Sequence, residues 1–95
     1  MKQPAVYILA SKKNGTLYVG VTSNLQQRIW HHKNHQADGF TKKYNITMWV
    51  YFEQAETMES AIVREKILKK IGRAEKINLI ETNNLHWIDL YESIL

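Results

Sequence analysis

An Asn-Gly dipeptide between two short apolar runs is the feature that most limits what this chain can fold into. The dipeptide is Asn14-Gly15, and Val, Ile, Leu and Tyr are concentrated on either side of it, in residues 5–10 and 16–22. Asn-Gly favours a tight β-hairpin, because a type I′ turn needs a positive φ at both central residues. The two flanking stretches are therefore predicted to form paired strands.

The length of the hairpin loop decides which residues face each other across the two strands. With the dipeptide alone in the loop, Tyr7 lies opposite Thr22, and the two strand tyrosines are about 13 Å apart along the strands. A loop of residues 12–15 instead places Tyr7 opposite Gly20 and diagonal to Tyr18, as expected if the tyrosines act together. In both registers the tyrosines and the glycine share one face, because side chains alternate along a strand. The opposite face is the predicted core face and carries Val6, Ile8, Leu17, Val19 and Val21.

A helix is predicted directly after the hairpin, over about residues 24–35. Its cap is Ser23 or Asn24, whose side chain can accept a hydrogen bond from a free backbone N–H. Arg28 and His32 lie one turn apart beside the apolar stripe of this helix. The hairpin and helix together deliver two tyrosines, an arginine and a histidine.

The rest of the chain alternates in a way that predicts an α+β fold. The predicted order is β-β-α-β-α-α-α, with a small three-stranded, mainly antiparallel sheet flanked by helices. The sequence has 95 residues and no evident linker or repeat, so residues 1–95 are expected to form a single domain. The remaining predicted elements are a polar loop at 34–44, a strand at 46–52 and helices at 58–71, 73–82 and 86–95.

Composition excludes several classes of site and partner. The chain has no cysteine, which rules out disulfides, thiolate metal sites and cysteine nucleophiles. Its net charge is +4, which suits contact with nucleic acid or simply keeps the protein in solution. The start of the chain lacks the apolar run of a signal peptide, and no stretch has the roughly 18 apolar residues of a membrane span. A soluble cytoplasmic protein without a membrane partner is expected.

Glu65 is the sharpest local anomaly in the sequence. It falls near the centre of an apolar helical stripe that Ala61 and Leu68 help to form. A carboxylate is rarely placed there unless it is paired or bound to a metal. Two interpretations stay open: a metal ligand, or an ion pair with Arg28, Arg64 or Lys69.

The chain as a whole resembles the GIY-YIG nuclease family, and most closely its small stand-alone single-domain members. The two signatures are Val-Tyr-Ile at residues 6–8 and Tyr-Val-Gly at residues 18–20. Arg28, His32 and Glu65 follow in the order that the family shows. Val6 stands where the first signature has Gly, and Val19 stands where the second has Ile. Position 6 is expected to face the core.

The resemblance implies an endonuclease that hydrolyses phosphodiester bonds in nucleic acid with one divalent ion, Mg²⁺ or Mn²⁺. DNA is expected as the substrate ahead of RNA, although the residues leave the choice between them open. Glu65 would hold the metal, and Arg28 would neutralise the scissile phosphate. Tyr7 and Tyr18 would position or deprotonate the attacking water, and His32 completes the predicted catalytic set. Magnesium needs few protein ligands, so one carboxylate suffices. Substrate-binding residues are expected at Gly20, Lys33, Lys42, Lys69 and Asn84.

Several alternatives stay open at this point. The chain is also compatible with a nucleic-acid-binding module that has little catalytic activity, or with a protein-interaction module that keeps only the fold. His32 is either a core-edge histidine or a partner of a tyrosine or a phosphate, and Gly20 either marks a bulge or leaves space for a phosphate. The lysines form a solvated face or follow a phosphate backbone. Tyr44, Tyr51 and Tyr91 are interpreted as packing residues.

Overall fold

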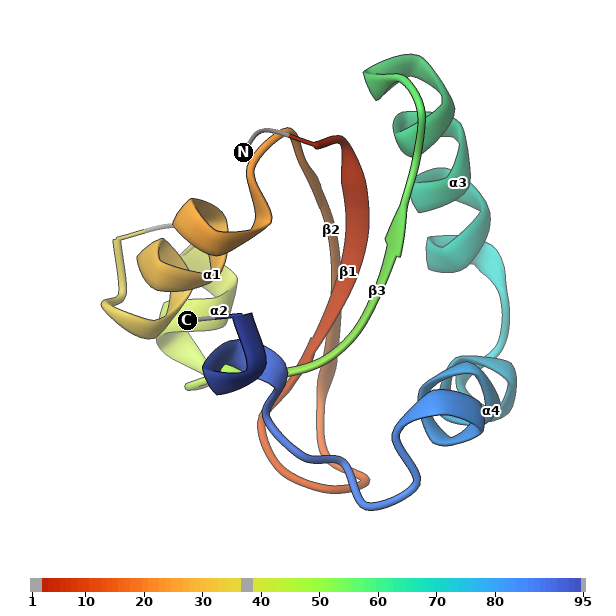
Figure 1. Ribbon diagram of the computed structural model, residues 1–95. Helices are drawn as coiled ribbons and strands as arrows, with labels where there is room; N and C mark the ends of the chain where they lie inside the picture. Colours follow the sequence, from red (N-terminus) through yellow and green to blue (C-terminus); the bar gives the residue numbers. More distant parts are fainter. Residues whose placement is uncertain (1–2, 37–38, 95) are drawn as a thin grey trace.

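A small antiparallel sheet lies at the centre of the molecule. The computed structural model describes residues 3–36 and 39–94. Its three strands are β1 (Ala5–Ala10), β2 (Leu17–Thr22) and β3 (Met48–Gln54), in the order β2-β1-β3. The α+β class and the antiparallel sheet are as predicted, although β3 begins and ends two residues later than expected. Figure 1 shows the sheet standing between two groups of helices.

The hairpin has the four-residue loop, the register expected for cooperating tyrosines. Tyr7 pairs with Gly20, and Ala10 pairs with Leu17. Asn14 has a φ of 61°, but no described glycine has a positive φ. The prediction of a type I′ turn from Asn-Gly is therefore wrong. The loop is longer than the dipeptide, and of Asn14 and Gly15 only the asparagine has the left-handed conformation.

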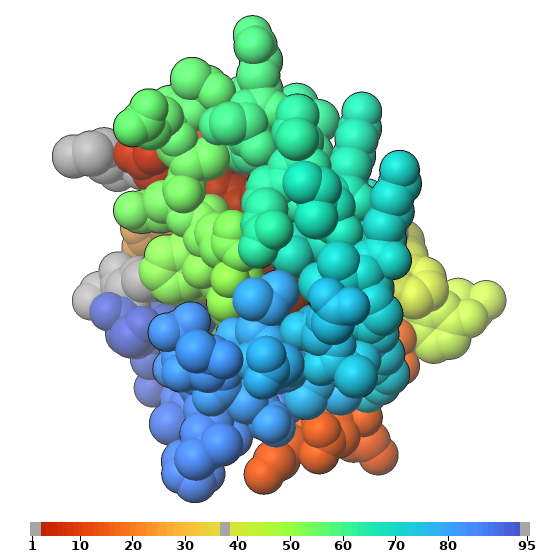
Figure 2. All heavy atoms as spheres, turned by 90° about the vertical axis from the view of Figure 1, so that its right-hand side faces the viewer, coloured from red at the N-terminus to blue at the C-terminus, as the bar shows by residue number. Residues whose placement is uncertain are grey.

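Helices cover both faces of the sheet (Figure 1). On one face lie α1 (Leu25–Lys33) and the short α2 (Gly39–Lys43). On the other lie α3 (Met58–Lys70) and α4 (Arg73–Asn83), which fill most of the view in Figure 2. The prediction of a plain loop at 34–44 is wrong because it missed α2. The last predicted helix is reduced to a 3₁₀ turn, η1 (Leu90–Ile94), of five residues.

The two faces have separate cores. All six residues of β1 have zero exposure, so this strand is buried on both sides. The strand parity predicted from the sequence is confirmed, because the two tyrosines enter one core and the five aliphatic residues assigned to the opposite face enter the other. The α3 side buries Val6, Ile8, Val19, Val50, Ala61, Leu68, Ile80 and Trp87. The α1 side buries Tyr7, Leu9, Ile29, Ile46 and Trp49.

Side-chain caps fix where the helices start. Asn24 caps α1 by accepting a hydrogen bond from the backbone N–H of Gln27. Thr57 and Ser60 form a reciprocal capping box at the start of α3. Both caps agree with the predicted starts.

Within the described part of the chain, no helix is long and apolar enough to cross a bilayer.

Candidate active site

Four of the predicted catalytic residues meet on the α1 side of the sheet. The phenol oxygen of Tyr7 lies 2.8 Å from Nε2 of His32, and Nε of Arg28 donates to the same oxygen at 3.4 Å. The Tyr18 ring lies 6.4 Å from the Tyr7 ring and 5.4 Å from the His32 ring, measured between centroids. The hairpin register and the phase of α1 thus bring two tyrosines, one arginine and one histidine together.

Gly20 provides the space in which Tyr7 sits. A Cβ atom at this glycine would lie 2.4 Å from both Cζ and Oη of Tyr7, well inside contact distance. The two residues are direct partners in the β1–β2 ladder, whose pairing is regular through this point. The structure therefore gives the glycine a packing role next to the tyrosine ring, and it shows no bulge there.

His32 is fully buried, and both of its ring nitrogens have partners. Nε2 faces the Tyr7 hydroxyl, and Nδ1 lies 3.0 Å from Oγ1 of Thr41. Thr41 belongs to α2 and is itself buried. When the N–H at Nδ1 donates to Thr41, Nε2 carries no hydrogen and can accept a hydrogen bond from the Tyr7 hydroxyl. Sequence reasoning missed the threonine because the segment around α2 is polar and shows no periodic apolar pattern.

Arg28 is partly buried beside the tyrosines. Its hydrogen bond to Tyr7 raises the pKa of the guanidinium above its ordinary value, and the charge and hydrogen bond of Tyr18 add to this rise, against the opposing effect of desolvation. The arginine therefore stays fully charged at this site. It supplies the positive charge that a bound phosphate would meet.

The two tyrosines differ in exposure. Tyr7 has zero exposure, whereas Tyr18 is only half-buried. The Tyr18 ring continues outward to Phe40 of α2, at 6.3 Å between centroids and 27° between planes. A molecule from solvent therefore meets Tyr18 first, with Tyr7 behind it.

Unlike the other four predicted catalytic residues, Glu65 lies in the group of helices on the other face of the sheet (Figure 1). It lies on α3, which packs against β2, the strand that carries Tyr18. Its side chain is 15% exposed and makes an ion pair with Lys69 at 3.3 Å. Lys69 was one of the three ion-pair partners considered from the sequence. Among the described residues, no group of three or more His, Asp or Glu side chains is gathered for a metal.

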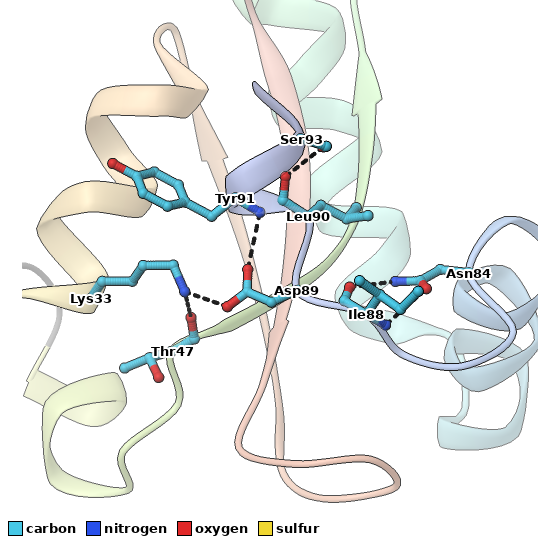
Figure 3. A network of polar contacts seen from close by, with 8 residues as sticks. All are labelled: Lys33, Thr47, Asn84, Ile88, Asp89, Leu90, Tyr91 and Ser93. Atoms are coloured by element: carbon cyan, nitrogen blue, oxygen red, sulfur yellow. Dashed lines mark hydrogen bonds and ion pairs between the residues drawn. The ribbon is translucent and has the colours of Figure 1, made fainter. Parts of the chain in front are cut away.

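Two of the expected substrate-binding residues have their polar groups engaged within the fold (Figure 3). Lys33 contacts the carboxylate of Asp89 and donates to the backbone oxygen of Thr47 at 3.0 Å. The Asn84 amide donates to the backbone oxygens of Val50 and Ile88, at 3.1 and 2.8 Å. These contacts tie the C-terminal segment to α1 and β3, so the structure gives both residues a structural role.

The remaining lysines of the predicted set are accessible to solvent. Lys42 is exposed on α2, two residues from Phe40 and directly after Thr41. The Lys69 side chain is 53% exposed despite its ion pair with Glu65. A role for either lysine in substrate binding stays a prediction.

Comparison with known proteins identifies relatives along most of the chain. The family model described as the GIY-YIG catalytic domain matches residues 3–78. A UPF0213 protein of Clostridium perfringens is 38% identical over 80 residues, which cover 84% of this chain and 85% of the relative. A UPF0213 protein of Staphylococcus saprophyticus is 34% identical over 80 residues, covering 84% and 96% of the two chains.

A solved structure supports the fold. The solution NMR structure of a UPF0213 protein from Bacillus halodurans matches with a TM-score of 0.57 and covers 95% of each chain. The two sequences are 23% identical, so this likeness concerns the arrangement of the backbone.

Proposed function

Because the chain belongs to the GIY-YIG nuclease family, we propose that it is a metal-dependent endonuclease that hydrolyses phosphodiester bonds in nucleic acid, DNA rather than RNA. The observation that carries the proposal is the cluster of Tyr7, Tyr18, Arg28 and His32. Phosphodiester hydrolysis needs an activated water, a cation at the phosphate and an environment that holds both in place. The cluster contains residues suited to each of these tasks within a single domain.

Arg28 is proposed to bind the scissile phosphate. Its guanidinium is a planar fork that can make paired hydrogen bonds to phosphate oxygens. The Tyr7 hydroxyl accepts from its Nε and fixes the orientation of this fork. Attack on phosphorus adds negative charge to these oxygens, and a cation held in advance stabilises that charge without having to reorient.

Tyr18 is proposed to be the tyrosine that meets the attacking water. It is half-buried, whereas the hydroxyl of Tyr7 is enclosed and already bonded to His32 and Arg28. A phenolate is the form that can accept a proton from water, and a nearby cation favours this form. Tyr7 and His32 then act as positioning residues behind the reacting tyrosine.

Glu65 is proposed to hold one divalent ion, Mg²⁺ or Mn²⁺. One carboxylate fits magnesium, which keeps several waters and shares the substrate phosphate as a ligand. The Glu65 side chain is mostly buried on α3, and its partner Lys69 is exposed and free to swing away when a metal arrives. A bound ion would supply Lewis-acid stabilisation of the phosphate charge.

The direct test is to incubate the purified protein with end-labelled DNA and RNA in buffers that contain Mg²⁺, Mn²⁺ or EDTA. We expect cleavage of DNA in either metal and none in EDTA. Cleavage that persists in EDTA, or no cleavage of any substrate, would overturn the proposal.

A nucleic-acid-binding module without catalysis is the second candidate. The ion pair between Glu65 and Lys69 favours it, because the lysine already neutralises the carboxylate that a metal would need as its ligand. Binding to DNA that is unchanged in Glu65→Ala, together with no cleavage by the wild type, would select this candidate.

A further inference from the structure

A row of aromatic rings leads from the tyrosine cluster to the surface. Tyr18 stacks on Phe40, and the Phe40 ring lies 4.9 Å from the Tyr44 ring, again between centroids. The row thus begins at the proposed catalytic tyrosine, passes over α2 and ends at Tyr44, the residue directly after this helix. Its outer members are open to solvent, since Phe40 is 44% and Tyr44 is 50% exposed.

The exposure of these two rings contradicts a pure packing role. Tyr44 was expected to be a packing residue, but half of it faces water. Isolated exposed apolar residues are ordinary, whereas adjoining exposed rings beside a candidate site indicate a contact surface. In Figure 2 the yellow spheres of the segment around α2 stand out from the right-hand edge of the molecule.

The charge beside the row is positive. The Lys43 ammonium group lies 5.4 Å from the centre of the Tyr44 ring, and Lys42 is exposed one residue earlier. Flat rings with lysines between them match a strand of nucleic acid, whose bases offer π-faces and whose phosphates are anionic. An acidic peptide would match the lysines but would leave the rings without a partner.

We propose that Phe40 and Tyr44 form a stacking site for an unpaired nucleobase next to the scissile phosphate. The inference rests on the proposed function and adds the substrate class: a single-stranded or locally unpaired strand. In an intact duplex the faces of the bases are covered by their neighbours, so a ring on the protein surface cannot stack on them.

The link between α2 and the cluster explains how this site would act on cleavage. Thr41 follows Phe40 directly in the sequence, and its Oγ1 lies 3.0 Å from Nδ1 of His32. A base held on Phe40 would therefore place its phosphate near Tyr18 and Arg28, through the ring contact that already joins Tyr18 to Phe40. Stacking thus positions the strand for attack.

The test measures stacking in EDTA, where the proposed cleavage cannot occur. The probe is a thymine oligonucleotide with one 2-aminopurine, whose fluorescence falls when the base stacks on an aromatic ring. We expect the wild type to quench the single-stranded probe, and Phe40→Leu or Tyr44→Leu to bind it about five- to hundred-fold more weakly with most of the quenching lost. Affinity for the duplex form should change less than about two-fold.

Trp30→Leu is the matched control. Trp30 has the same 44% exposure as Phe40, but it lies on α1 and lines a different hollow, with Gln26, Gln27 and Tyr91. The control should bind and quench like the wild type. Tyr44→Phe keeps the ring and should also keep the quenching, while thermal melts establish that each variant is folded.

The outcomes separate this inference from the proposed function. Quenching that survives both leucine variants, or that falls equally in Trp30→Leu, would overturn the stacking site even if the protein cleaves DNA in Mg²⁺. Loss of quenching in the two leucine variants would support the site even if no cleavage is found. The same probe made of RNA shows which sugar the unpaired strand carries, and stronger quenching by either form supports the site.

Discussion

Alternate side chains of β1 enter two different interiors. Val6 and Ile8 pack under α3 and α4 with other aliphatic side chains, whereas Tyr7 packs under α1 beside His32 and Thr41. All five of these residues are almost completely buried. The α3 side therefore gains most of its stability from apolar burial, although it also buries the Asn84 amide, while the α1 side buries a hydroxyl, an imidazole and a phenol in contact with one another.

This difference indicates which face of the sheet carries buried groups that stability alone does not require. Buried polar groups must recover their lost hydration through hydrogen bonds, and apolar residues of similar shape often stabilise a protein as well or better. In the described residues, every buried polar side-chain atom has a partner. The polar network of the α1 side is thus complete, as expected if these groups serve the proposed chemistry.

The largest expected effect comes from Glu65, the one residue that the α3 side is proposed to contribute to catalysis. Glu65→Gln keeps the shape of the side chain and removes its charge. We expect cleavage to fall by more than about a thousand-fold, because the divalent ion loses its ligand. Thermal melts should no longer respond to added Mg²⁺.

Full activity in this variant would remove Glu65 from the mechanism and leave its ion pair with Lys69 as its role. Lys69→Met is the matched control, because it breaks the same ion pair and keeps the carboxylate. This second variant should still cleave in Mg²⁺ and not in EDTA at saturating DNA, even where the loss of a predicted substrate-binding lysine weakens its affinity for DNA.

Arg28→Lys tests the α1 side directly. The substitution keeps a positive charge but loses the fork that makes paired hydrogen bonds. We expect cleavage to fall about a hundred-fold, with DNA binding in EDTA changed by about two-fold or less. Equal losses in cleavage and binding would show that the arginine only adds to the basic surface.

Leu68→Ala tests the apolar side. Leu68 has zero exposure on α3, and its truncation should lower the free energy of unfolding by about 2–5 kcal/mol. At temperatures where the variant is folded, the cleavage rate per molecule should stay near that of the wild type. The matched control is Val63→Ala on the same helix, where the side chain is 58% exposed and the expected change is within about 0.5 kcal/mol. If cleavage falls by more than the fraction of unfolded protein explains, the claim that Leu68 on the α3 side serves stability alone is contradicted.

The smallest expected effect concerns a polar clamp between β3 and α3. Arg64 donates to both carboxylate oxygens of Glu53, at 2.9 and 3.0 Å, and these bonds lower the pKa of Glu53, helped by the Tyr51 hydroxyl. Burial and the bond to Glu53 raise the pKa of Tyr51 to about 12.

These shifts give the clamp a defined pH dependence. A carboxyl group whose pKa is lowered by folding stabilises the fold at every pH above its pKa in the unfolded state. This contribution is lost as the pH falls through the pKa of the folded state. The raised pKa of Tyr51 makes its contribution disappear as the pH rises from 10.0 to about 12. Melting temperatures measured across pH should fall at both ends, and Glu53→Gln should flatten the acidic end without changing cleavage. An unchanged acidic end would show that the clamp adds no stability.

The sequence was most informative where local rules agree with the tertiary packing. Strand alternation assigned Tyr7 and Tyr18 to one face, and the capping side chains at Asn24 and Thr57 located two helix starts. The prediction for α3 was less complete. Its Ile67 is 45% exposed although it is apolar, because the stripe that packs on the sheet is narrow.

The rest depended on contacts between distant parts of the chain. Nothing in a polar segment of five residues shows that Thr41 will reach His32, or that Phe40 will stack on Tyr18. The same holds for Lys33, whose partner Asp89 lies 56 residues away in the sequence. Such pairs become visible only when the helices are placed on the sheet.

The most direct test of the account is the rate of DNA cleavage in Mg²⁺ by Tyr18→Phe relative to the wild type. The variant keeps the ring that packs between His32 and Phe40 and removes only the hydroxyl. We predict that the wild type cleaves, that the variant is slower by about a hundred- to thousand-fold, and that both melt at nearly the same temperature. Cleavage by the variant at the wild-type rate would contradict the claim that the α1 side is an active site.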